Sequence, residues 1–319
     1  MKIDTMRNVD YFAGIPLCFL ATLLIRFINL FAGKKIRRPE KVLFIELSEM
    51  GSAILADPAM RKMQQAGPVE LYFLIFKSNA ASLRLLNTIP EAHIFTIRAD
   101  RLLNLAVDSL RFLLWARQQR IDTVIDLELF SRYSALLTGL SGAINRIGFH
   151  AFHNEGLYRG DLLTHRVAYN PHLHIAKNFI ALVNAALADR KELPFSKTLI
   201  DDDEIKLARA EVSENVIAAM HNSVRSAYPP YDQQRHRIVL INPNASDLLP
   251  QRRWMPDYFV AVMRALLNDY NEVLVLITGA PAEREEAERL KQRVGHERCI
   301  NFAGRQRLEE LPALYRIAE

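Results

Sequence analysis

The sequence predicts an α/β protein made of two doubly wound parallel sheets, preceded by a hydrophobic helix at the N-terminus. Beyond residue 39, short β-rich apolar runs alternate with longer helical stretches, and this alternation indicates parallel strands joined by crossover helices. It is interrupted once, by Tyr228-Pro229-Pro230-Tyr231 and the polar residues that follow, which mark a linker between two halves. A chain of 319 residues, half of them hydrophobic, is long enough for two buried cores.

Charge and cysteine content exclude several classes of protein. The 41 Lys and Arg residues nearly balance the 36 Asp and Glu residues, and a net charge of +5 disfavours a dedicated nucleic-acid binder. The two cysteines, Cys18 and Cys299, are far apart and form no CxxC pair, which disfavours both a disulfide framework and a cysteine zinc site. We therefore expect a protein of a reducing compartment.

The first forty residues differ in composition from the rest. From Tyr11 to Phe31, 16 of 21 residues are apolar. A basic run follows directly, formed by Lys34, Lys35, Arg37, Arg38 and Lys41. Only Lys2 and Arg7 precede the apolar stretch, and this order of charges does not fit a cleaved secretory signal.

Within this segment, a helix from Pro16 to Phe31 would be about 24 Å long, shorter than the ~30 Å hydrocarbon core of a bilayer. Thr22, Arg26 and Asn29 are spaced to share one face, which favours a helix lying in the membrane interface. Two alternatives stay open. The helix is a single-pass anchor if residues 11–15 join it, or an amphipathic helix packed on its own globular domain.

The first α/β series has four expected strands and four expected helices. The strands are expected at Val42–Leu47, Val69–Phe76, His93–Ile97 and Thr123–Leu127. The helices are expected at Ser52–Gln65, Ser78–Leu86, Leu102–Arg117 and Arg132–Leu140. Two more helices, Leu173–Leu187 and Asp201–Ala219, lead to the linker.

The second series begins after the linker. Its strands are expected at Ile238–Asn242, Val273–Thr278 and Cys299–Phe302, and its helices at Pro256–Tyr270, Ala282–Val294 and Leu311–Glu319. Three strands are too few for a complete doubly wound half, so we expect this domain to be incomplete. The expected organisation is a membrane-associated segment (1–38), an N-terminal domain (39–190), a helical linker region (191–236) and a C-terminal domain (237–319).

The loop after the first strand is the first candidate for a site, because ligands of open parallel sheets bind beyond the carboxyl ends of the strands. It contains Glu46, Glu49, Gly51 and Ser52. Gly51 permits a tight turn, Ser52 can cap the next helix, and a carboxylate at a crevice can act as general base. Taken alone, Glu49 is more simply explained as a solvated loop acid. The single glycine disfavours a dinucleotide site.

The corresponding loops of the second half have the composition of an anion site. Small polar residues follow its first strand, and Arg252 and Arg253 come just before a helix, a plausible cradle for a diphosphate. The alternative is a surface loop whose arginines form weak ion pairs. In the next loop, the Glu283 carboxylate either accepts bonds from ribose hydroxyls or only serves the helix dipole. An HxH pair, His172 and His174, lacks a third metal ligand nearby and better fits a polar helix start.

Taken together, several segments resemble the family 9 glycosyltransferases, the group of the lipopolysaccharide heptosyltransferases. They follow the family's order and spacing from about Arg38 to the end: KVLFIELSEMGSAILADPAM, RIDTVIDLELFSRYSALLTGLSGAINRIGF, INPNASDLLPQRRWMPDYF, VLVLITGAPAEREEAERL and NFAGR. The resemblance implies a GT-B architecture, in which two Rossmann-like halves face a cleft. The acceptor is expected on the N-terminal half and the nucleotide-sugar donor on the C-terminal half. It also implies inverting transfer without a metal or another cofactor.

The match in the first loop is informative because it is imperfect. Heptosyltransferases usually have Gly-Asp where this chain has Gly51-Ser52, and that aspartate is the favoured catalytic base. Serine cannot take a proton from a sugar hydroxyl unaided at neutral pH. Glu49 is therefore the substitute candidate, with Glu46 behind it.

On the donor side, the resemblance assigns binding roles to residues of two loops. Asn244 and Ser246 match small polar residues that approach the diphosphate, and Arg252 matches a basic phosphate ligand, with Arg253 beside it. Glu283 matches an acid near the nucleoside and follows Gly279 at the strand end. The family's later Asp-x-Gly-x-x-His block would lie beyond residue 319.

Three hypotheses follow from different classes of protein. The leading one is a membrane-associated glycosyltransferase that takes a sugar from a donor such as ADP-heptose. Its acceptor would be lipopolysaccharide core or a related glycolipid at the cytoplasmic face of the inner membrane. The second is a nucleotide-sugar binding or regulatory homologue whose chemistry is impaired. The third is a scaffold held by its N-terminal helix.

Overall fold

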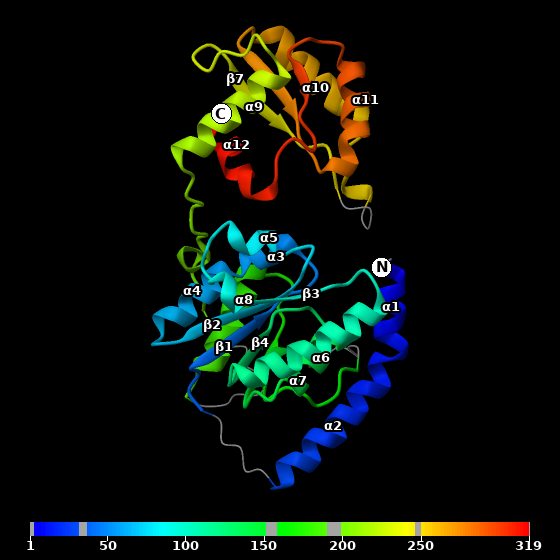
Figure 1. Ribbon diagram of the computed structural model, residues 1–319, viewed down its shortest axis with the longest axis vertical. Coiled ribbons are helices and arrows are strands. Elements are labelled where there is room, and N and C mark those ends of the chain that lie inside the picture. The colour runs from blue at the N-terminus through cyan, green and yellow to red at the C-terminus, as the bar shows by residue number, and fades with distance from the viewer. Residues whose placement is uncertain (1–2, 32–36, 151–157, 190–198, 246–249, 319) are drawn as a thin grey trace. The chain divides into compact units, whose positions relative to one another are not determined.

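The structure of the protein is a computed structural model that describes residues 3–31, 37–150, 158–189, 199–245 and 250–318. It consists of two compact units, Met1–Arg209 and Ala210–Glu319, each an α/β unit around a parallel sheet (Figure 1). The predicted α/β class with two parallel sheets is confirmed.

Six parallel strands form the first sheet, in the order β3-β2-β1-β4-β5-β6. They are β1 (Lys41–Ile45), β2 (Glu70–Phe76), β3 (Ile94–Ile97), β4 (Thr123–Asp126), β5 (Asn145–His150) and β6 (His165–Ala168). The chain moves outward from β1 to β3, then returns to the other side of β1 and moves outward again from β4. The carboxyl ends of β1 and β4 therefore form the topological switch point, where doubly wound sheets bind ligands.

Helices cover both faces of this sheet because its central strands are buried on both sides. Phe44 of β1 faces a core with α4 and α8, whereas Leu43 faces a core with α6 and α7. The helices of the unit are α1 (Ile3–Phe12), α2 (Gly14–Phe31), α3 (Met50–Leu55), α4 (Asp57–Gln65), α5 (Ala81–Arg84), α6 (Leu102–Gln118), α7 (Arg132–Leu140) and α8 (Ile175–Leu187). Two short 3-10 helices are η1 (Glu91–His93) and η2 (Asp202–Ile205).

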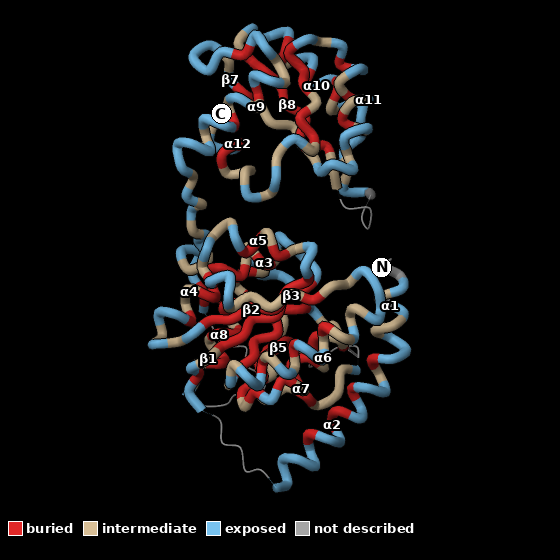
Figure 2. The backbone as a smooth tube through the Cα atoms, viewed as in Figure 1, coloured by how far each residue is buried: buried red, intermediate tan, exposed pale blue. Residues whose placement is uncertain are grey.

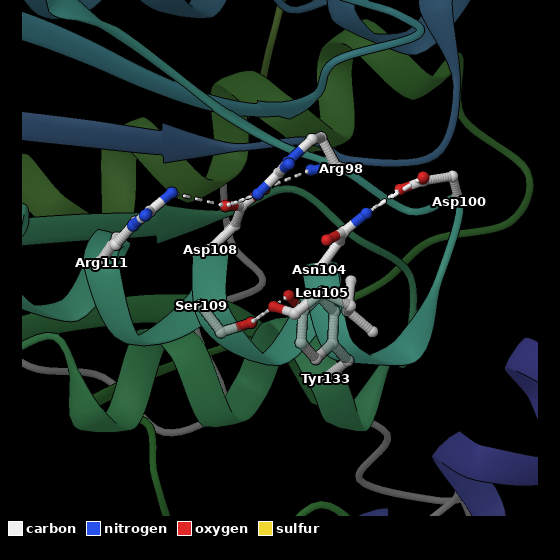
Figure 3. A network of polar contacts seen from close by, with 8 residues as sticks. All are labelled: Arg98, Asp100, Asn104, Leu105, Asp108, Ser109, Arg111 and Tyr133. Atoms are coloured by element: carbon white, nitrogen blue, oxygen red, sulfur yellow. Dashed lines mark hydrogen bonds and ion pairs between the residues drawn. The ribbon is translucent and has the colours of Figure 1, made fainter.

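A polar network holds α6 in place (Figure 3). The buried Asp108 carboxylate accepts two 2.8 Å hydrogen bonds from the Arg98 guanidinium, which follows β3. These bonds lower the pKa of Asp108 to about 2. The Ser109 hydroxyl lies 2.6 Å from the hydroxyl of Tyr133 on α7. The network fixes α6 on the sheet, and none of its residues belongs to the candidate loops.

The second unit has a three-stranded parallel sheet in the order β7-β8-β9, formed by β7 (Arg237–Ile241), β8 (Val273–Ile277) and β9 (Cys299–Asn301). One face packs on α10 (Pro256–Asp269) and α11 (Arg284–Val294), and the other on α9 (Glu214–Ala227) and α12 (Leu311–Ile317). Three 3-10 turns complete it: η3 (Pro250–Arg252), η4 (Pro281–Glu283) and η5 (Leu308–Glu310).

Three expectations about elements are wrong. Strands β5 and β6 were not expected. In β5, Arg146 and Gly148 interrupt the apolar run, and the buried Arg146 guanidinium is satisfied by the carbonyls of Leu162 and Ala143. The helix expected at 201–219 begins with a separate 3-10 turn, η2, and is an α-helix only from Glu214, where α9 starts. The helix expected at 52–65 is two helices, α3 and α4.

Candidate functional site

The loop after β1 places two carboxylates at the switch point of the first sheet. Glu46 directly follows β1, and its side chain is buried. Glu49 is exposed and stands at the N-cap of α3, with extended backbone. The Glu49 backbone N–H donates to Glu46 Oε1 at 3.3 Å, so the inner carboxyl helps to fix the backbone that carries the outer one.

Two expectations about this loop are wrong. Helix α3 begins at Met50, so Ser52 lies in its first turn and is not its cap. Gly51 is also helical and makes no tight turn; a Cβ added there would meet nothing within 4 Å. Ser52 instead donates from its hydroxyl to Glu49 Oε2 at 3.0 Å. Ser52 thus holds the Glu49 carboxylate in place.

A third carboxylate, Glu128, holds this loop from the neighbouring strand. It follows β4, and its Oε1 accepts hydrogen bonds from the backbone N–H groups of Leu47 (2.8 Å) and Ser48 (2.9 Å). The Ser48 hydroxyl donates to the same atom at 3.0 Å. From β2's side, the Asn79 amide donates to the Leu47 carbonyl at 2.9 Å. The loop is therefore fixed at both peptide groups before Glu49.

Burial sets the protonation of the inner carboxyls. Desolvation first, and then the charge of Glu128, raises the pKa of Glu46 far above its usual range. Desolvation also raises the pKa of Asp126, at the end of β4, to about 7, although the Arg159 guanidinium opposes this. Burial therefore favours the protonated form of Glu46 and disfavours this carboxyl as a base, whereas Glu49 of the same loop is exposed.

Sequence reasoning gave no role to Asp126 and Glu128. The signal was present: Asp126 lies near the carboxyl end of the strand expected at Thr123–Leu127, and Glu128 directly follows it. Carboxyl ends of adjacent parallel strands meet at one edge of a sheet. What the sequence could not supply was the adjacency of β4 to β1, where Ile45 lies opposite Asp126.

In the second unit, the loops after β7 and β8 converge. The Asn244 side-chain amide donates to the Thr278 carbonyl at 3.3 Å, which ties one loop to the other. A Cβ added at Gly279 would lie 2.7 Å from Asn244 Nδ2 and 2.8 Å from Glu283 Oε2, so glycine is what lets these two side chains approach. Three of the predicted donor residues are therefore neighbours.

The Glu283 carboxylate caps the turn that follows β8. Its Oε2 accepts a 2.6 Å hydrogen bond from the Ala280 backbone N–H, which fits its interpretation as a residue serving a helix start. A role toward a ribose stays a prediction.

The two arginines differ in their surroundings. Arg253 donates from Nε and Nη2 to the Ala245 carbonyl, at 3.2 and 2.8 Å, and so braces the loop after β7. Arg252, at the end of η3, is exposed and makes no hydrogen bond or ion pair within the described residues. Among the described contacts, the Arg252 guanidinium is therefore the less engaged of the two. Ser246 lies outside the described residues.

In the part of the chain that the structure describes, no three His, Cys, Asp or Glu side chains are grouped so that they could hold a metal ion. His174 stands at the N-cap of α8, where its Nδ1 accepts from the Ala176 backbone N–H at 3.3 Å. This confirms the interpretation of the HxH pair as a polar helix start.

Comparison with known proteins gives one family and a set of similar folds. The family model "Glycosyltransferase family 9 (heptosyltransferase)" matches residues 111–319. A comparison with curated proteins finds no match.

Three solved structures are among those similar to this chain. The Escherichia coli ADP-heptose LPS heptosyltransferase II has a TM-score of 0.65 at 17% identity, over 87% of this chain and 77% of that one. A family 9 glycosyltransferase of Veillonella parvula has 0.65 at 15%, over 90% and 75%. The E. coli heptosyltransferase WaaC with ADP-2-deoxy-2-fluoro heptose has 0.59 at 15%, over 87% and 80%. At these identities the likeness shows the fold, which is that of the GT-B heptosyltransferases.

Proposed function

The chain belongs to glycosyltransferase family 9, the heptosyltransferases, and on that premise we propose the reaction that it catalyses. It transfers a sugar, in the first instance a heptose, from a nucleoside diphosphate donor to a hydroxyl of lipopolysaccharide core or a related glycolipid. The proposal rests on one observation above all. An exposed carboxylate, Glu49, stands at the switch point of the first sheet and is held there by Ser52 and by the backbone contact to Glu46.

In the proposed mechanism, Glu49 takes the proton of the acceptor hydroxyl as its oxygen attacks the anomeric carbon. The bond from that carbon to the nucleoside diphosphate breaks, and the configuration at the carbon is inverted. Arg252 stabilises the negative charge of the departing diphosphate, so the step requires no metal. Asn244, Gly279 and Glu283 form the neighbouring donor surface, with Arg253 bracing it. We also propose Ser246 as a diphosphate contact, from its match to the family alone.

The donor proposal draws support from the similar solved structures. One of them holds an ADP-heptose analogue and another, WaaC again, holds ADP. We therefore propose ADP-heptose as the first donor to try. The domain roles proposed here follow the family: residues 39–190 take the acceptor, 237–319 take the donor, and 191–236 connect them.

The acceptor and the place of reaction are proposed together. A glycolipid acceptor is confined to a membrane, and nucleotide sugars are available on its cytoplasmic side. The described helix α2 is long and apolar enough to cross a membrane by length and composition. We propose that the enzyme works at the cytoplasmic face of the inner membrane and contacts it through its N-terminal segment.

Replacing the proposed base tests the mechanism. Glu49→Gln should reduce kcat by a factor of about 10²–10⁴ while leaving the donor Kd within twofold, because the amide cannot accept the proton. Rates would be measured with a lipopolysaccharide acceptor and a panel of nucleotide sugars, and donor binding by calorimetry. Ser52→Ala is the matched control: it keeps the carboxylate and loses only its support, so its loss should be smaller.

Two other outcomes distinguish the remaining functions. Unchanged turnover in Glu49→Gln would remove this residue from the mechanism. Donor binding without turnover by the unmutated protein would favour a nucleotide-sugar binding or regulatory homologue, which the serine at position 52 makes the second candidate. A scaffold held by its N-terminal helix, the third hypothesis, predicts no nucleotide-sugar affinity at all.

A further inference from the structure

Helix α2 turns its less hydrophobic side toward the protein and its more hydrophobic side outward, the reverse of a helix in a soluble domain. Its buried residues include the small or polar Gly14, Cys18, Ala21 and Thr22, together with Ile25. At 100° per residue, these positions lie within one third of the helix circumference. Figure 2 shows buried positions alternating with long exposed stretches along the helix. The side turned toward the protein is thus the less hydrophobic one.

Specific contacts fix the helix in this orientation. The Asp161 backbone N–H donates to Thr22 Oγ1 at 2.9 Å, and Arg26 donates to the Asp161 carboxylate at 3.1 Å. Gly160, at φ +72°, comes so close to α2 that an added Cβ would lie 2.7 Å from the Cys18 carbonyl oxygen. Ala135 of α7 and Leu162 complete the contact. Such a fit between backbones shows a built packing surface rather than an incidental contact.

The opposite side of α2 is exposed and apolar. It carries nine large hydrophobic residues whose exposed fractions run from 42 to 79%: Leu17, Phe19, Leu20, Leu23, Leu24, Phe27, Ile28, Leu30 and Phe31. On a helical wheel they occupy one continuous half of the helix, and no charged residue interrupts them. Exposing a continuous apolar patch of this kind in water is costly, and such patches often mark sites of contact with a protein or a membrane.

The size and charge of this face favour a bilayer over a protein as its occupant. Half the surface of an 18-residue helix is about 27 Å by about 15 Å, or about 400 Å², half of the area that a stable protein interface buries on each partner. A bilayer has no such minimum. The basic run Lys34, Lys35, Arg37 and Arg38 directly follows the helix in the sequence, which suits anionic headgroups.

The contacts also decide how the helix meets the bilayer. To cross it, α2 would have to leave Asp161 and carry the Arg26 guanidinium into the hydrocarbon core without this partner. We infer that α2 lies in the interface of an anionic bilayer, with its apolar half in the acyl region and its polar side clamped to the first unit. The inference rests on the membrane location proposed above, not on the sugar-transfer chemistry.

Vesicle flotation of the full chain tests this orientation. The unmutated protein should float with vesicles of phosphatidylethanolamine and phosphatidylglycerol, and should bind phosphatidylcholine vesicles more weakly. L20E/F27E, which changes two exposed positions on the apolar half, should weaken binding at least tenfold. L20S/F27S should also weaken it, because it removes apolar surface without adding charge. Tyr315→Glu, an exposed site in the second unit (63%), is the matched control and should bind normally.

Alkaline carbonate separates the two membrane modes. An interfacial helix should be released from membranes at pH 11, whereas retention there would show a spanning helix and overturn the inference. Equal vesicle binding by L20E/F27E and the unmutated protein would overturn it too, as would no binding by either. Nucleotide-sugar binding by L20E/F27E, measured by calorimetry, should stay unchanged. If neither the unmutated protein nor any variant bound a nucleotide sugar, that result would instead count against the proposed function.

Discussion

Glu46 shows how a residue can lie in a candidate site and yet be unsuited to the chemistry proposed there. It directly follows the strand that ends at the switch point, where sequence reasoning looked for a base. Burial beside Glu128 keeps it protonated at neutral pH. Its neutral carboxyl accepts from the Glu49 backbone and fills a position where a charge would be costly.

This protonation predicts how stability depends on pH. Because burial raises the pKa of Glu46 above its ordinary 4.5, the protonated form favours folding. The contribution of this protonation to stability is fully present at a pH below the ordinary pKa of 4.5, and it is lost as the pH rises through the raised pKa. Glu46→Gln imitates the neutral form, so its free energy of unfolding should exceed that of the unmutated protein by about 1 kcal/mol or more at pH 8. At pH 5 the gain should be smaller.

Urea unfolding at both pH values measures this difference. Glu91→Gln serves as control, since Glu91 is an exposed partner of Arg84 and carries no burial cost. A gain for Glu46→Gln that is equal at pH 5 and pH 8 would show that Glu46 is ionised in the folded protein.

At the scale of elements, the close approach of Gly160 to α2 predicts a large cost for one methyl group. Gly160→Ala places a Cβ against the Cys18 carbonyl and forces a positive φ on alanine. It should lower the free energy of unfolding by about 1–3 kcal/mol and loosen α2. Gly51→Ala is the opposite case: the site is helical and open, so it should be neutral or raise stability by up to about 1 kcal/mol.

Urea unfolding of both variants, with limited proteolysis of the N-terminal segment, measures these effects. Equal stability of Gly160→Ala and the unmutated protein would mean that α2 is not packed as described.

Most elements were predictable because hydrophobic periodicity is local. Helix α7 occurs at the predicted residues. Strands β1 to β4 and β7 to β9 begin and end within one residue of the expected positions, except that β1 ends two residues early. Strand β5 was not predictable, since burial of the Arg146 guanidinium depends on carbonyls of two residues outside the strand, Ala143 and Leu162. The polar face of α2 was visible in the sequence. That this face turns inward depends on Asp161, which is 135 residues beyond Arg26.

The same limit applies to the candidate site. The exposed Glu49 was identified from its loop, whereas Glu128 was missed because its contacts to Leu47 and Ser48 span about 80 residues. On the donor side, Asn244 and Glu283 were named separately, and only the fold shows that Gly279 lets them meet. Sequence shows which groups are present, and topology decides which become neighbours.

For the whole molecule, the proposed division of labour predicts where a nucleotide acts. If the second unit takes the donor, saturating ADP should slow backbone hydrogen exchange in its loops at 242–245 and 278–283 by at least threefold. At a concentration of 100 times Kd, binding adds about 2.7 kcal/mol to the folded state of the unit that binds. Exchange in the loop at 46–52 should not change. Adenosine without phosphates is the control, and protection centred on 46–52 would reverse the assignment.

The contact between Asp10 and Arg132 has a practical consequence for anyone who shortens this chain. The Arg132 side chain is only 4% exposed, and the Asp10 carboxylate lies 3.2 Å from it and also accepts from the Tyr133 backbone N–H at the start of α7. Truncation before residue 37 would remove the counter-ion of that guanidinium. It would also expose Ala135 and Leu162, which pack against α2, to solvent. If a shortened protein precipitates, the cause would therefore be damage to the first unit and not the loss of a membrane contact.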